Sequence, residues 1–232
     1  MTQLTVCMFS NLYPPVVSGS STQTYFLAQE LARQGHKVIV ITAQVDAATP
    51  ESTEQDGVIV HRLKASVLPA LSIALNFPWL NLTFRPANLR RVTAILEEHR
   101  PDILHLHNHM FDLGLVAARM RKRFKIPMVT TVHTIIRHSN PLYNLVLLPA
   151  DRILLKKLVI DKSDRLICPD FNVSRYVQET FHRAGTTIVP YGIETLTNFD
   201  PERVEELRQQ YQLQQKRVIL SVGHVHEIRN RH

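Results

Sequence analysis

The strongest constraint on the fold is a repeated alternation of short runs rich in β-branched residues with longer amphipathic segments. Lys37–Thr42 is hydrophobic between its ends, and strand-like runs recur at 4–9, 57–63, 102–106, 128–132, 165–168, 187–189 and 217–222. Strands that are hydrophobic along their whole length are typical of a parallel sheet covered on both faces. Helices are expected between them, at 22–34, 88–99, 112–124, 150–162, 173–181 and 201–211. This order predicts an α/β, doubly wound Rossmann-like parallel sheet with helices on both faces.

The organisation into domains follows from composition. We expect residues 1–195 to form one Rossmann-like domain, because the alternation is continuous there. Residues 196–216 are polar and rich in glutamine, which indicates a helix and linker. The strand at 217–222 then begins a second domain that would be truncated at His232, since a lone strand cannot bury its own surface.

Cysteine and hydropathy patterns indicate the compartment. Cys7 and Cys168 both lie in apolar strand-like runs, which favours buried thiols in a reducing, cytoplasmic compartment over a disulfide framework. No basic, apolar leader precedes the first strand, and no apolar run reaches the roughly 18 residues that a spanning helix needs. We therefore expect a cytoplasmic protein that is soluble or peripheral on the inner face of the membrane.

The net charge of +7 is concentrated in one part of the chain. Residues 85–165 contain 15 Lys or Arg and 7 Asp or Glu. Such a zone attracts phosphates, anionic lipids or nucleic acid, unless it is only a solvated set of helix faces. We do not expect nucleic acid, because the zone lacks the exposed aromatic residues on which bases stack.

Histidines cluster where two predicted strands end. His105 and His107 share one face of a strand, with His109 in the loop that follows, and His133 ends the next strand. Alternate histidines are compatible with a metal site, but a buried, hydrogen-bonded histidine is the commoner outcome, and no metal is expected. A neutral imidazole at His133 would either hydrogen-bond a substrate or merely cap the strand.

Two further segments allow a functional and a structural interpretation. The loop after the first strand contains Gly19 between serines, before a predicted helix N-terminus that offers N–H groups to a phosphate, but it lacks the dinucleotide-binding glycine pattern. The amphipathic stretch 150–162 combines apolar residues with Arg152, Lys156 and Lys157. It either lies on an anionic membrane or packs on the sheet.

From Leu4 to His232, an ordered set of motifs resembles glycosyltransferase family 4, which comprises retaining enzymes with two Rossmann-like domains, the GT-B fold. The motifs are Tyr13-Pro-Pro-Val-Val-Ser-Gly19, Leu27-Ala-Gln-Glu-Leu-Ala-Arg-Gln-Gly-His-Lys-Val38, Arg100-Pro-Asp-Ile-Leu-His-Leu-His107, Thr131-Val-His-Thr134, Val189-Pro-Tyr-Gly-Ile-Glu194 and Ile219-Leu-Ser-Val-Gly223. The resemblance implies transfer of a hexose from a nucleotide-sugar, with this chain as the acceptor-side half, inactive without a donor domain beyond His232.

The resemblance also implies roles for residues. His133 contacts the transferred sugar and is the candidate catalytic residue. The donor diphosphate would be bound by Ser18, Gly19, Ser20, His224 and Arg229, and the acceptor by Tyr13, His107, Asn108 and Arg137. The nucleotide-sugar is a co-substrate, and no cofactor is expected. Leaving-phosphate stabilisation would be the main catalytic contribution.

The chain departs from the family pattern at four positions. Ser18 stands where the family has the first glycine of a pair, and Tyr191 replaces the usual asparagine. His224 replaces an arginine that grips the diphosphate, and Arg229 replaces a lysine. Since imidazole is mostly neutral at pH 7, His224 weakens the expected grip, whereas Arg229 keeps the charge.

The acceptor class follows from one more similarity. Residues 133–162 resemble the basic, apolar excursion of lipid-glycosylating members, such as diacylglycerol glucosyltransferases. This indicates a membrane lipid or lipid-linked glycan as acceptor and an anionic membrane surface as partner. Two other functions stay open: a glycan- or lipid-binding domain without catalysis, and a metal-dependent hydrolase that uses His105, His107 and His133.

Overall fold

The computed structural model describes residues 2–16, 18–67, 81–137, 141–192 and 200–219. Its contacts divide the chain into two units, residues 1–192 and residues 193–232. The first unit holds an eight-stranded sheet in the order β10-β9-β8-β7-β1-β2-β4-β3. All neighbouring strands in it are parallel except β3 and β4. The predicted α/β fold with a mostly parallel sheet is confirmed; the predicted domain boundaries stay predictions.

The strands of the large sheet are short and mostly buried. They are β1 (Thr5–Ser10), β2 (Lys37–Gln44), β3 (Ser52–Gln55), β4 (Val58–Lys64), β7 (Ile103–His107), β8 (Met128–Thr131), β9 (Arg165–Cys168) and β10 (Thr187–Ile188). A separate pair, β5 (Ser66–Val67) and β6 (Asn81–Leu82), lies outside this sheet. The antiparallel edge strand β3 was not predicted, because its mostly exposed, polar residues Ser-Thr-Glu-Gln lack a hydrophobic pattern.

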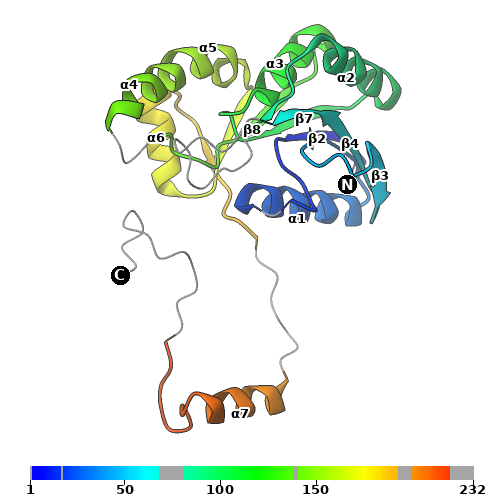
Figure 1. The fold of residues 1–232 in the computed structure, drawn as a ribbon. Coiled ribbons are helices and arrows are strands. Elements are labelled where there is room, and N and C mark those ends of the chain that lie inside the picture. The colour runs from blue at the N-terminus through cyan, green and yellow to red at the C-terminus, as the bar shows by residue number, and fades with distance from the viewer. Residues whose placement is uncertain (1, 17, 68–80, 138–140, 193–199, 220–232) are drawn as a thin grey trace. The chain divides into compact units, whose positions relative to one another are not determined.

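Helices cover both faces of the sheet, as Figure 1 shows. Helix α1 (Gly19–Arg33) packs on one face, where Ala28 meets Val6 and Met8 of β1. Helices α2 (Pro86–His99) and α3 (Leu113–Phe124) pack on the other face, against Cys7 and Phe9. Helix α6 (Phe171–Phe181) covers β9, in a third apolar cluster. Both cysteines are buried and free, as predicted.

The segment predicted as one helix over 150–162 has a different structure. Helix α4 (Pro141–Pro149) begins earlier and continues as a π-helical segment, Ala150–Leu155, followed by α5 (Lys156–Leu158) and a 3₁₀ turn at Ile160–Lys162. The prediction placed the start too late because residues 141–149 contain no charged side chain, so the sequence shows no polar face that would mark a helix there.

Helix α1 also begins earlier than predicted, at Gly19. Ser18 is its N-cap: the Ser18 hydroxyl accepts from the Ser21 N–H at 3.1 Å, and the Ser21 hydroxyl accepts from the Ser18 N–H at 2.8 Å. This reciprocal pair is a capping box with serine in the position where glutamate is commoner. Gly19 and Ser20 therefore lie in the first helical turn, and not in the preceding loop.

The second unit contains one helix among its described residues, α7 (Pro201–Gln210), which matches the prediction closely. Asp200 caps it by accepting from the N–H groups of Glu202 and Arg203. The strand predicted at 217–222 is not found at Arg217–Ile219, which are irregular, and its remainder lies outside the described residues.

Candidate functional site

The carboxyl ends of the parallel strands bring three separate segments of sequence together. β7 ends at His107, β8 ends at Thr131 just before His133, and the chain returns after β10 at Tyr191. In doubly wound sheets this edge is where ligands bind, because the loops there are free to vary while the strands stay fixed.

Four aromatic rings form a continuous stack at this edge. The ring of His105 lies 4.2 Å from that of His107, His107 lies 5.4 Å from His133, and His133 lies 5.5 Å from Tyr191. The expectation that His105 and His107 share a face is confirmed. Register explains the rest, because His107 pairs with Thr131, and His133 follows two residues later.

Hydrogen bonds link the rings into a chain. His107 Nδ1 lies 3.1 Å from His133 Nε2, and His133 Nδ1 lies 2.7 Å from the Tyr191 hydroxyl. His105 Nε2 bonds the Thr131 hydroxyl at 2.8 Å. His107 Nδ1 and both nitrogens of His133 are thus engaged in this chain of bonds. No group of His, Cys, Asp or Glu in the described ranges has an arrangement that could hold a metal ion.

Burial keeps these imidazoles neutral. It lowers the pKa of His105 to about 4, with a further contribution from His133, and it lowers the pKa of His133 to about 4, with a further contribution from His109. The pKa of His107 is held well below its usual value, first by burial and then by both neighbouring histidines. At pH 7 the stack therefore carries no charge and acts through hydrogen bonds only.

The proton positions on the rings of His107 and His133 follow from which buried nitrogen can remain without a hydrogen-bond partner at the lower cost. His107 Nε2 is buried and has no partner in the described part of the chain. A buried acceptor without a partner costs less than a buried N–H without one, which places the proton of His107 on Nδ1. His107 then donates to His133, and His133 Nδ1 donates to the Tyr191 oxygen. The Tyr191 hydroxyl proton is left to point at a ligand.

Other polar side chains at this edge also have unused capacity. Asn108 has a positive φ of 73°, which asparagine tolerates, and its Nδ2 donates to the Thr134 hydroxyl at 3.1 Å. Asn108 Oδ1, both amide atoms of Asn11 and the Thr42 hydroxyl are buried with no partner among the described residues. Such groups are uncommon in folded proteins and mark places where a ligand can supply the missing bonds.

The N-terminus of α1 lies next to the stack. Gln23 Nε2 on the second turn of α1 donates to the Gly192 carbonyl at 3.4 Å, beside Tyr191. Gly19 and Ser20 present first-turn N–H groups that have no acceptor within the helix. A side chain at Gly19 would meet no heavy atom within 4 Å, so space is open there. The Ser18 side chain, by contrast, is used in capping.

Of the remaining predicted residues, only Tyr13 and Arg137 belong to the described part of the chain. Tyr13 is 6% exposed, packs edge-on against Tyr25 in the cluster under α1, and burial raises its pKa. Arg137 is exposed. His224 and Arg229 lie outside the described residues. The roles predicted for these four residues stay predictions.

A buried polar network next to the stack escaped the sequence analysis. Asp151 and His109 are both fully buried, with Asp151 Oδ1 3.0 Å from His109 Nε2, and the other oxygen of Asp151 accepts a short hydrogen bond from the Tyr176 hydroxyl. Asp151 and Asp161 are the two acids in an otherwise apolar and basic stretch, which was the available signal. Asn11 and Tyr191 were also missed as site residues, although Asn11 directly follows β1 and Tyr191 lies three residues after the end of β10.

Comparisons with known proteins agree with this geometry. The profile of Glycosyltransferase Family 4 matches residues 17–195. The α-monoglucosyldiacylglycerol synthase of Streptococcus pneumoniae is 24% identical over 228 residues, 94% of this chain and 48% of that protein. The D-inositol 3-phosphate glycosyltransferase of Thermobispora bispora is 28% identical over 213 residues, 88% of this chain and 48% of that protein.

A solved structure shows the same fold. The sucrose-phosphate synthase of Thermosynechococcus elongatus superimposes with a TM-score of 0.67 at 18% identity, covering 91% of this chain and 53% of that one. The chain thus spans about half the length of the curated relatives and of the two-domain GT-B structure that it matches.

Proposed function

The chain belongs to glycosyltransferase family 4, and we propose that it is the acceptor-side half of a retaining enzyme that moves a hexose from a nucleotide-sugar to an acceptor. It would be inactive without a donor-binding half, because the diphosphate needs positive groups that the described residues at this edge do not supply. The proposal adds no metal cofactor, since basic side chains and helix N–H groups would neutralise the diphosphate.

The observation that carries the proposal is the neutral His133 held by hydrogen bonds on both sides. Its position is fixed by His107 behind and Tyr191 in front, at distances of 3.1 Å and 2.7 Å. Because both ring nitrogens are already bonded, a sugar hydroxyl would share the Nδ1 proton with the Tyr191 oxygen. An imidazole that is already oriented loses little entropy in such a contact, so its binding energy is available in the transition state. We assign His133 to the transferred sugar.

Donor and acceptor would meet around this stack. The N–H groups of Gly19 and Ser20 would bind the diphosphate, at the positive end of a helix of 15 residues. The departing phosphate oxygen would then stay on the same face of the sugar as the incoming hydroxyl. This geometry allows front-side displacement with retained configuration.

The acceptor would bind beside Asn108 and His107, whose Oδ1 and Nε2 are free to accept hydrogen bonds from hydroxyl groups. We propose that the acceptor is a membrane lipid or a lipid-linked glycan and that the enzyme is peripheral on the inner face of the membrane. Support comes from the Streptococcus pneumoniae relative, whose name specifies a diacylglycerol glycoside. In the described part of the chain, no helix has both the length and the apolar character to cross a bilayer.

A transfer assay tests the proposal. The 232-residue chain and the longest reading frame that contains it are each incubated with labelled UDP- and GDP-sugars and a bacterial lipid extract. We expect labelled lipid from the longer protein only, with the anomeric configuration of the donor retained in the product by NMR. Inversion of configuration would refute the retaining mechanism, and transfer by the 232-residue chain alone would refute its dependence on a second half. Binding of acceptor without transfer by any longer protein would favour a non-catalytic binding domain.

A further inference from the structure

The segment Pro141–Leu158 exposes its large apolar side chains. Leu142, Leu145 and Val146 of α4 are 70%, 72% and 72% exposed. Ile153, Leu154 and Leu158, in the π-helical segment and α5, are 68%, 54% and 37% exposed. We call these six residues the outer face. Monomeric soluble proteins rarely leave a contiguous set of this kind in water.

Sequence spacing places the outer face along one side of the helical segment. The six positions are separated by three, one, seven, one and four residues, and steps of three, four and seven recur on a single helix side. The π-helical segment between Ala150 and Leu155 adds a small rotation in the middle. The apolar residues therefore form a stripe.

The polar anchor of the segment faces the opposite way. Asp151 is 0% exposed and is held inside by His109 and the Tyr176 hydroxyl. An ordinary surface helix would bury its leucines and expose its carboxylate. Here the order is inverted. Rotation of the segment to hide the leucines would break both hydrogen bonds of Asp151 and leave the buried His109 without this partner, so the rotation is opposed.

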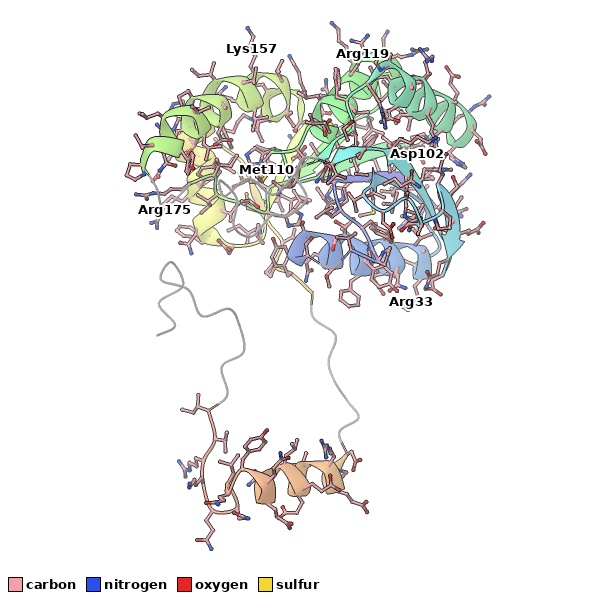
Figure 2. The ribbon with its side chains drawn as sticks, in the orientation of Figure 1. Arg33, Asp102, Met110, Arg119, Lys157 and Arg175 are labelled. Carbon is pink, nitrogen blue, oxygen red and sulfur yellow. The ribbon has the colours of Figure 1, made fainter. Side chains whose placement is uncertain are left out.

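Basic side chains border the outer face. Arg152 and Lys157 are exposed and form no ion pair with another described residue, whereas Lys156 is paired with Asp161 at 2.9 Å. Figure 2 shows Lys157 pointing away from the body of the domain. An apolar stripe next to unpaired cations is complementary to an anionic bilayer, which has hydrocarbon below a layer of negative headgroups. A second copy of this chain carries the same positive charge and is not complementary in this way.

We propose that the outer face, together with Arg152 and Lys157, docks the domain on an anionic lipid bilayer. The docking rests on the proposed function in one respect: it serves an enzyme that must reach a lipid acceptor at a membrane. The exposed side chains and the unpaired charges that support docking do not depend on sugar transfer. The segment would lie in the interface, with the leucines below the headgroups and the cations among the phosphates. Asp151 links this segment to His109, one residue from Asn108, so the docked face is held at a fixed distance from the candidate site.

Vesicle flotation tests the docking without any transfer reaction. The full 232-residue chain is floated with phosphatidylcholine vesicles, with and without phosphatidylglycerol, at low and high salt. We expect enrichment on the anionic vesicles that falls with salt, because charges near the surface are screened within about 10 Å at 0.1 M. Equal recovery on both lipids, or no flotation, would overturn the proposal.

Paired variants locate the docking face. R152E/K157E should lower partitioning by more than about 25-fold, since each lost cation is worth about fivefold and the added carboxylates are repelled as well. L145Q/I153Q should lower it roughly 100-fold or more, at about tenfold or more for each inserted side chain. The matched controls carry the same changes elsewhere on the domain: R119E/K122E on α3 and F26Q/L27Q on α1, all exposed. Figure 2 shows Arg119 on the edge of the domain.

The controls should float like the wild type. Losses that are equal in the controls and in the outer-face variants would overturn this location. A concentration-dependent dimer that L145Q/I153Q dissociates, in a chain that does not float, would instead assign the outer face to a second copy. Failure of flotation leaves the transfer assay unaffected, so the two proposals can fail separately.

Discussion

The two edges of the sheet use polar side chains in opposite ways. At the amino ends of the strands, side chains bond the main chain: Asp102 Oδ2 accepts from the Thr5 N–H at 2.7 Å, and Asp164 Oδ2 accepts from the Met128 N–H at 2.8 Å. At the carboxyl ends, Asn11, His107 and Asn108 each keep a buried polar atom with no partner in the described residues.

The difference indicates which edge stabilises the fold and which edge binds a ligand. Asp164 also binds Arg121 through two hydrogen bonds, which lower the pKa of the Asp164 carboxyl, so its capacity is fully used. At the carboxyl edge, buried polar atoms lack such bonds, which lowers the stability of the fold. This loss is understandable if a ligand supplies the missing bonds. Free nitrogens on His61 and His99 are the exception; these rings face each other between β4 and α2, 5.8 Å apart.

The largest expected effect is a loss of stability in acid that arises at the carboxyl edge. The pKa values of His105 and His133 are lowered to about 4, from a usual 6.5, and that of His107 is also held well below 6.5. The unfolded chain therefore binds protons that the folded chain does not, and stability present above pH 6.5 is lost as the pH falls toward 4. Below pH 6.5 the free energy of unfolding should drop by about 1.4 kcal/mol per pH unit for each histidine, so by ~4 kcal/mol per pH unit for all three.

Urea unfolding at pH 7, 6 and 5 measures this loss. A variant with all three histidines replaced by glutamine or asparagine is the control, and its stability should depend much less on pH over the same range. Equal slopes for the two proteins would show that the stack is not kept neutral by burial.

The next effect belongs to the amino edge. Asp164→Ala leaves the Met128 N–H and the Arg121 guanidinium without their acceptor and should lower the free energy of unfolding by about 1–2 kcal/mol. Sugar transfer per folded molecule, measured in the longer protein, should not change. A transfer defect beyond the loss of folded protein would place function at this edge too and break the comparison.

A smaller effect of opposite sign is expected for Asn11→Leu. Both amide atoms of Asn11 are buried without a partner, so an apolar side chain of similar size should raise the free energy of unfolding by about 1 kcal/mol. Transfer should fall several-fold at the same time. Thermal unfolding and the transfer assay together decide this, and a destabilised but fully active variant would mean that Asn11 is structural.

The smallest expected effect is that of Tyr191→Phe. It keeps the ring stacked on His133 but removes the hydroxyl 2.7 Å from His133 Nδ1. We expect KM to rise by roughly threefold to tenfold with little change in melting temperature, because one hydrogen bond of a partly exposed group is lost. Tyr191→Asn, which restores the residue usual in the family, should recover part of the loss.

The fold was largely readable from the sequence, because buried parallel strands are hydrophobic along their length. Cys7 and Phe9 pack on one face of β1 and Val6 and Met8 on the other, so no polar alternation obscured the strand. The edge strand β3 has no such pattern. The start of α1 was missed because Ser21 replaces the usual acidic partner of a capping box.

The site was predictable only as a set of positions. The end of a strand is visible in the sequence, and this identified His107 and His133, whereas Asn108 was predicted from the family resemblance. The bond between His107 and His133 depends on the register of β7 against β8, which a single sequence does not fix. Asp151 was missed because its helical segment buries the carboxylate and exposes the leucines, the reverse of an ordinary surface helix. This arrangement is set by tertiary packing and not by the local hydrophobic period.

The central claim is that the carboxyl edge carries the transfer reaction through His133. The direct test compares His133→Ala with Asp164→Ala in the longer protein, measuring transfer per folded molecule with one labelled nucleotide-sugar. The account predicts that His133→Ala lowers kcat/KM roughly 100-fold or more, as expected for loss of a preorganised transition-state contact, while Asp164→Ala keeps the wild-type value. Wild-type transfer by His133→Ala, or an equal loss in both variants, would contradict it.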